Sequence, residues 1–133
     1  MKTQGIVGPL PADAIDYGRV PKSSGMGAIN SLAREIHGVN EAVGWDVVDS
    51  ATWDEPDKAS RCLVLIHSEV TEVVQELRAQ EPDPVLVAEE LADIVIRTLS
   101  MAHGLGLDIE HAIRNKVRKN RIEGPKKRAE RRI

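Results

Sequence analysis

Aromatic residues are scarce in this chain of 133 residues, which has no Phe, one Tyr and two Trp. Its single cysteine, Cys62, excludes a disulfide within the chain and falls on an apolar helical arc, so we expect a buried structural thiol rather than a nucleophile. A core must therefore be built from Ala, Val, Leu and Ile. These residues recur at helical spacing, without a convincing run of period two. The composition predicts an all-α protein.

Long apolar runs are also missing. The sequence contains no stretch of about eighteen uncharged apolar residues, and its first residues do not resemble a signal peptide. We expect a cytoplasmic protein with no membrane partner. The length fits one domain, of a size at which oligomerisation often completes the core.

The net charge of −3 conceals a strong asymmetry. Residues 114–133 carry ten Lys/Arg and two Asp/Glu, a balance of +8, which leaves −11 for residues 1–113. An acidic centre and a basic end fit a metal ion and a polyphosphate that meet in one site. The alternative is a solvated basic tail, which we favour for residues 126–132.

Helical periodicity predicts four helices with short links, arranged as a small four-helix bundle. The expected helices cover residues 27–43, 58–79, 84–103 and 108–121. Residues 1–25 are rich in Gly, Pro and Ser and predict an extended or disordered arm. We expect the helical domain to cover residues 26–124 and a basic tail to cover residues 125–133.

Local signals support these boundaries. Asp83 and Asp108 suit the N-caps of the last two helices, and Pro84 suits a first helical position. Gly104 is a natural C-cap for the third helix. The short link at residues 80–84 predicts that the second and third helices form an antiparallel hairpin.

Two pairs of carboxylates occur on this hairpin at a spacing of three residues, Glu69 with Glu72 and Glu90 with Asp93. Residues three apart are neighbours on one helix face. At the rise of an α-helix, the midpoints of the pairs lie about 14 Å and about 11 Å from the turn, so the pairs stand at nearly the same height. Each pair also borders the apolar arc of its helix.

Converging carboxylates at the edge of a core repel one another unless they bind a cation. The hard cations Mg²⁺ and Mn²⁺ prefer oxygen ligands. Glu69, Glu72 and Glu90 have no basic partner four residues further on, which favours a metal site. The alternative is that all four acids are ordinary solvated helix residues.

Three further polar residues could contact phosphate. Lys116 and Asn120 fall within the apolar arc of the fourth helix, where the acids or a bound phosphate could be their partners. Lys116 could instead extend to solvent, and Asn120 could contact water near a frayed end. Arg97 lies one turn after Asp93 and could reach a phosphate or pair with Asp93 or Glu76.

The tryptophans lie in the expected loop over residues 44–57. An aromatic face stacks well on a nucleobase, and Trp45 is the better candidate for this contact. Trp53 is at least as well explained as a residue that closes the core. His37 and Asn40, late in the first helix, could meet the edges of a base.

The chain resembles the MazG-like, all-α nucleoside triphosphate pyrophosphatases from about Ile29 to Arg121. The resemblance rests on residues 66–72 (IHSEVTE), 89–93 (EELAD) and 116–121 (KVRKNR), with seventeen residues between the two acidic pairs. His37 and Trp45 resemble residues of members that handle pyrimidine deoxynucleotides. Many members have a Glu where this chain has Ser68, which leaves the number of metal ions open.

The resemblance implies Mg²⁺-dependent hydrolysis of a nucleoside triphosphate between its α- and β-phosphates, in a dimer or tetramer. Glu69, Glu72, Glu90 and Asp93 would then hold the metal, and Glu72 would act as the base. One alternative keeps this chemistry on phosphoribosyl-ATP or a guanosine alarmone. Another is a non-catalytic helical binding protein, attached to nucleic acid through its basic tail; the intact acid set argues against it, and we expect no nucleic-acid partner.

Overall fold

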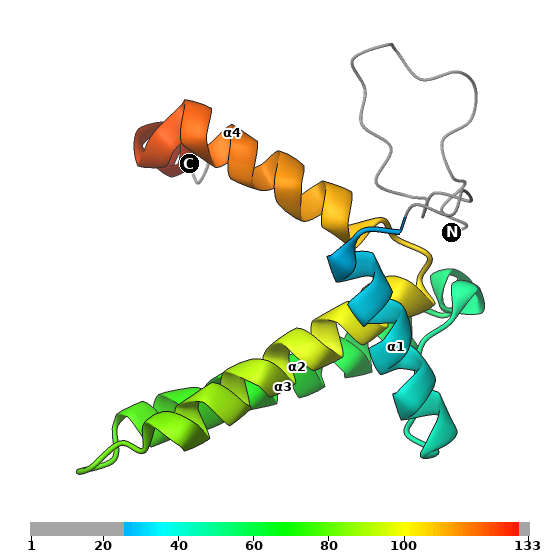
Figure 1. Ribbon diagram of the computed structural model, residues 1–133, viewed down its shortest axis with the longest axis horizontal. Helices are drawn as coiled ribbons and strands as arrows, with labels where there is room; N and C mark the ends of the chain where they lie inside the picture. Colours follow the sequence, from blue (N-terminus) through cyan, green and yellow to red (C-terminus); the bar gives the residue numbers. More distant parts are fainter. Residues whose placement is uncertain (1–25, 131–133) are drawn as a thin grey trace.

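A computed structural model describes residues 26–130 of the chain, of which residues 126–130 are described by their backbone. These residues are helical and include no strand, which confirms the predicted all-α fold (Figure 1). The elements are α1 (Ala28–Ala42), the 3₁₀ helix η1 (Ser50–Asp54), α2 (Pro56–Leu77), α3 (Pro84–Gly104) and α4 (Ile109–Glu130). The arm predicted for residues 1–25 lies outside the described residues, as do residues 131–133. No helix in the described part is both long and apolar enough to cross a membrane.

Helices α2 and α3 form the predicted antiparallel hairpin and pack along their length (Figure 1). The Asp83 side chain accepts a hydrogen bond from the Val85 amide at 2.9 Å, and Pro84 occupies the first turn of α3. Glu76 Oε1 accepts a hydrogen bond from the Asp83 amide at 2.9 Å. Glu76, which the sequence offered as a partner for Arg97, thus ties the end of α2 to the turn.

The small core lies where α1 and the loop after it meet the last turns of α3. The buried apolar side chains there are Ala33, Val48, Leu99, Ala102 and Leu105, and Val73 is buried separately on α2 beside Glu72. The backbone carbonyl of Val48 lies so close to Gly104 that a Cβ on this glycine would collide with it. The close packing of Val48 against α3 therefore requires a glycine at position 104. Gly104 is the last residue of α3, so the prediction that it is the C-cap is wrong. Leu105 is the C-cap, and the positive φ of 75° falls on Gly106.

A buried polar junction joins the N-terminal ends of α1 and α4. The Glu110 carboxylate accepts hydrogen bonds from the amides of Ile29 at 2.6 Å and Asn30 at 3.2 Å. Asn30 Nδ2 donates to Asp108 Oδ1 at 2.8 Å, and that oxygen also accepts from the His111 amide at 3.1 Å. Asp108 thus caps α4 as predicted, and the carboxylate of Glu110 satisfies amides at the start of α1.

Helix α4 leaves this junction and extends away from the hairpin (Figure 1). Its main contacts within the chain are with α1 and α3. The four helices therefore do not close into a bundle around a shared core, because α4 is held chiefly at its first turns. A kink at Gly124, with φ 62° and ψ −175°, interrupts α4 three residues after the predicted end of the helix at residue 121. The backbone then continues as a helix to Glu130, so the described part of the predicted basic tail is helical.

Candidate metal centre

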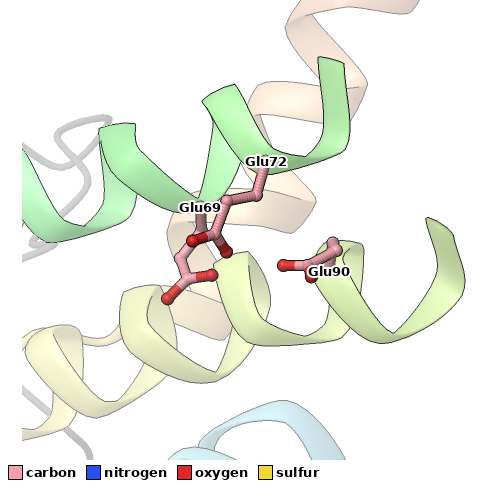
Figure 2. A group of neighbouring side chains, drawn as sticks. All are labelled: Glu69, Glu72 and Glu90. Atoms are coloured by element: carbon pink, nitrogen blue, oxygen red, sulfur yellow. The ribbon is translucent and has the colours of Figure 1, made fainter. Parts of the chain in front are cut away.

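Three carboxylates from the two arms of the hairpin meet midway along it. Glu69 and Glu72 belong to α2 and Glu90 to α3, and each offers an oxygen within 4.8 Å of the others (Figure 2). The equal height of the acid pairs, inferred from helical rise, is the reason that side chains so distant in sequence converge. Carboxylate oxygens at this spacing suit a hard divalent cation.

Asp93 is the fourth predicted ligand. It lies one turn after Glu90 on α3, and its side chain is exposed. Its oxygens are not part of the group within 4.8 Å. The structure therefore brings together three of the four predicted ligands, and the role of Asp93 stays a prediction.

Glu90 gives the sharpest indication that the site suits a cation. Its Oε2 is buried and has no hydrogen-bond partner among the described residues. Burying a carboxylate oxygen without a partner is costly. A cation between Glu90 and the two glutamates of α2 would remove that cost, so the residues present fit a divalent metal.

Arg97 already neutralises part of this acidic group. Its Nε donates to Glu69 Oε1 at 2.9 Å, and the Glu69 side chain is 13% exposed. The sequence offered Asp93 or Glu76 as ion-pair partners for Arg97, and both suggestions were wrong. Arg97 crosses from α3 to α2 and holds one oxygen of a candidate ligand.

The proximity of three acids changes the acidity of Glu72. Hydrogen bonding with Glu69, then with Glu90, and repulsion from their negative charges raise the pKa of Glu72 from 4.5 to about 6. A carboxylate with this pKa is a better proton acceptor near neutral pH than an ordinary glutamate.

The raised pKa predicts how the metal-free protein responds to pH. The folded state binds the Glu72 proton more tightly than the unfolded state, so this group contributes stability below pH 4.5 that is lost as the pH rises through about 6. We expect the melting temperature of the metal-free protein to decrease between about pH 5 and pH 7 through this group, measured against Glu72→Gln. Millimolar Mg²⁺ favours the ionised carboxylates and should oppose the decrease. An identical pH response in the parent and in Glu72→Gln would contradict the proximity of the three acids.

A small cavity of about 50 Å³ lies beside the acidic group and shares Arg97 with it. Asn40 and Trp45 line the same cavity, and Trp45 is 58% exposed. Cys62 also lines it, half-buried rather than fully buried as expected, and burial raises the pKa of its thiol. Two of the predicted base-contact residues thus border one cavity next to the carboxylates.

The other two residues proposed for this region have structural partners. A ring nitrogen of His37, Nε2, lies 3.0 Å from the Val48 carbonyl oxygen, and the ring packs against His103 with centroids 5.1 Å apart. Trp53 Nε1 donates to the Leu105 carbonyl at 3.1 Å and thus contacts the end of α3, but its side chain is 39% exposed and does not lie within the core. His37 therefore supports the loop that carries Trp45, and its contact with a base stays a prediction.

Lys116 and Asn120 lie on α4 with exposed side chains. Because α4 extends away from the hairpin, the structure does not bring them to the acids of the same chain (Figure 1). Sequence reasoning missed two further residues of the region. Ser100 is buried in the cavity wall, and Val48 forms the wall and contacts Gly104. A loop valine carries no signal that could have identified it.

The comparison with known families adds a finding that is independent of this geometry. The model of the MazG-like family matches residues 64–131. The chain belongs to the MazG-like family. This membership suggests a function of the nucleoside triphosphate pyrophosphatase type, in a family that typically uses a divalent metal. Searches of curated proteins and of solved structures gave no match.

The matched segment includes the hairpin acids and α4. It begins at Val64, so it does not cover α1 or the loop with Trp45. The acid group therefore has two independent supports, its geometry and the family match. Asn40 and Trp45, the predicted base-contact residues at the cavity, are supported by the geometry alone.

Proposed function

We propose that this protein is a Mg²⁺-dependent pyrophosphohydrolase that converts a nucleoside or deoxynucleoside triphosphate to the monophosphate and pyrophosphate. Such an enzyme would control nucleotide pools or remove unwanted nucleotides. The observation that carries the proposal is the buried, unpartnered Oε2 of Glu90 beside Glu69 and Glu72. This burial argues against a binding protein whose acids are merely surface residues.

Glu69, Glu72 and Glu90 would hold Mg²⁺, or Mn²⁺ in its place, and Asp93 would join them. When bound, the ion would neutralise charge on the triphosphate and lower the pKa of a water molecule. Arg97 restrains the Glu69 carboxylate through Oε1, which leaves the other oxygen of Glu69 for the ion.

Glu72 is proposed as the general base, because a carboxylate that the metal does not fully engage can accept a proton from water. It accepts a proton as water attacks the α-phosphorus. A bond forms between the water oxygen and that phosphorus, the bond to the bridging oxygen breaks, and pyrophosphate leaves. Lys116 and Asn120 can donate hydrogen bonds to phosphate oxygens, and their role in the site stays a prediction because the main contacts of α4 are with α1 and α3.

A panel of nucleoside triphosphates tests this function. Canonical and modified ribo- and deoxyribonucleotides, with phosphoribosyl-ATP and a guanosine alarmone, are incubated with the protein and scored for release of pyrophosphate. We expect release from at least one triphosphate with Mg²⁺ and its loss with a chelator. No turnover of any compound, or turnover that the chelator leaves unchanged, would refute the proposal.

The cavity beside the acids predicts which side chain affects the choice of base. Trp45 lines it and is exposed enough to stack on a base, so Trp45→Ala should raise KM by about tenfold and change the order of preferred substrates. Trp53→Ala is the matched control, because Trp53 binds the Leu105 carbonyl and should affect stability more than substrate order. An unchanged order of substrates in Trp45→Ala would remove this residue from the pocket.

A further inference from the structure

The cavity beside the acid group is formed by three helices and one loop. Asn40 belongs to α1, Trp45 and Val48 to the loop after it, Cys62 to α2 and Ser100 to α3. The volume of about 50 Å³ is well below that of a pocket that encloses a whole small molecule. The cavity can therefore receive one edge of a ring, while the rest of the ring stays outside it.

Ser100 is the buried polar residue in the wall of this cavity. The residue is 7% exposed, and its hydroxyl has no hydrogen-bond partner among the described residues. Two other hydroxyls of the hairpin show the usual helical arrangement, since Thr71 Oγ1 donates to the His67 carbonyl at 3.2 Å and Thr98 Oγ1 to the Ile94 carbonyl at 2.7 Å. A buried hydroxyl without a partner is costly. Because Ser100 lines the cavity, a molecule bound there could supply the missing partner.

The position of Ser100 on α3 relates the cavity to the acid group. At about 100° per residue, Glu90, Arg97 and Ser100 fall within an arc of about 80° on one side of the helix. Ten residues separate Glu90 from Ser100, which corresponds to about 15 Å along the helix axis. Arg97 lies between them, contacts Glu69 and also lines the cavity. A nucleotide with its phosphates at the acids and its base at the cavity fits this order.

The loop after α1 holds Trp45 at the same cavity. The Trp45 amide donates to the Asn40 carbonyl at 2.9 Å, and the Trp45 side chain is 58% exposed. Stacking on an aromatic face tolerates every base, so discrimination between bases must come from contacts with their edges. Asn40 and Ser100 line the cavity with an amide and a hydroxyl, and each of these groups can both donate and accept a hydrogen bond.

We propose that Ser100 determines base specificity, because its hydroxyl forms a hydrogen bond with the polar edge of a base that stacks on Trp45. The hydroxyl accepts from an amino or imino group of the base, or donates to a ring nitrogen or a carbonyl oxygen. This role rests on the proposed function, which places the phosphates of a nucleotide at Glu69, Glu72 and Glu90.

Replacing Ser100 by Ala distinguishes this role from a structural one. In the free protein the hydroxyl has no hydrogen bond to lose and Ala is the better helix former, so the melting temperature of the metal-free protein should stay the same or increase. In the pyrophosphate-release assay, the loss of one neutral hydrogen bond should raise KM about three- to tenfold for the best nucleotide and leave kcat within about twofold. Bases that present different groups to Ser100 should be affected unequally, so the order of preferred nucleotides should change.

Thr98→Ala is the matched control. Thr98 is exposed on the same helix, its hydroxyl is bonded to the Ile94 carbonyl, and it does not line the cavity, so its removal should leave every KM unchanged. Unchanged KM values in Ser100→Ala, or an increase by the same factor for every nucleotide, would overturn the role of Ser100 in specificity. A clear decrease in the melting temperature of Ser100→Ala would overturn it as well, because the hydroxyl would then have a partner within the protein.

The same assay separates this role from the proposed function. A parent that releases pyrophosphate from no nucleotide would refute the proposed function and the role of Ser100 with it. Parental turnover together with unchanged KM values in Ser100→Ala would refute the role of Ser100 alone.

Discussion

Replacing Glu72 by Gln is expected to abolish metal-dependent release of pyrophosphate while the protein stays folded. The amide keeps the size of the side chain, but it has no negative charge for the cation and cannot accept the proton of water. General-base catalysis alone contributes about 10²- to 10⁴-fold, so kcat should decrease by at least about a hundredfold. The measurement is pyrophosphate release at saturating nucleotide and Mg²⁺.

Measurements of stability distinguish a loss of catalysis in Glu72→Gln from unfolding of the protein. Without metal, Glu72 is crowded by Glu69 and Glu90, so the neutral amide should leave the melting temperature unchanged or raise it at pH 7. Mg²⁺ should stabilise the parent through binding to the folded state and stabilise Glu72→Gln less. Glu89→Gln is the matched control, since Glu89 is exposed on α3 beside Glu90 and outside the acid group. Parental activity in Glu72→Gln, or an equal loss in Glu89→Gln, would disprove the assigned role.

The sequence predicts the hairpin and the meeting of Glu69, Glu72 and Glu90 because both depend on local periodicity. A turn of known length and a fixed rise per residue determine which side chains stand at one height. The helix starts at Asp83 and Asp108 are predictable for the same reason, since a cap acts over two or three residues.

Contacts between segments that are far apart in the sequence cannot be predicted from local helical periodicity. The ion pair between Arg97 and Glu69 depends on how α2 and α3 rotate against each other, and helical wheels drawn separately do not fix that rotation. The direction of α4 depends on Asn30 and Glu110, eighty residues apart, whose spacing carries no pattern. The sequence therefore predicts the four helices, but not the direction in which α4 leaves the junction.

Replacing Gly104 by Ala is expected to destabilise the protein by about 2 kcal/mol, although Ala is the better helix former. The new methyl group would collide with the Val48 carbonyl and would lie 2.9 Å from Nε2 of His37. The backbone at Val48 cannot yield as a flexible side chain would, and the Val48 side chain is 2% exposed in the core. Chemical denaturation of the metal-free protein measures the change in the free energy of unfolding.

Gly38→Ala is the matched control for this substitution. Gly38 also lies within a helix, but a Cβ there meets nothing within 4 Å. It should stabilise the protein by about 0.5–1 kcal/mol through helix propensity alone. Because Val48 lines the cavity with Trp45 and Arg97, Gly104→Ala should also raise KM, whereas Gly38→Ala should not. Equal stabilisation by both substitutions would contradict the close contact between Val48 and Gly104. It would also contradict the position of Val48 in the wall of the cavity beside the metal centre.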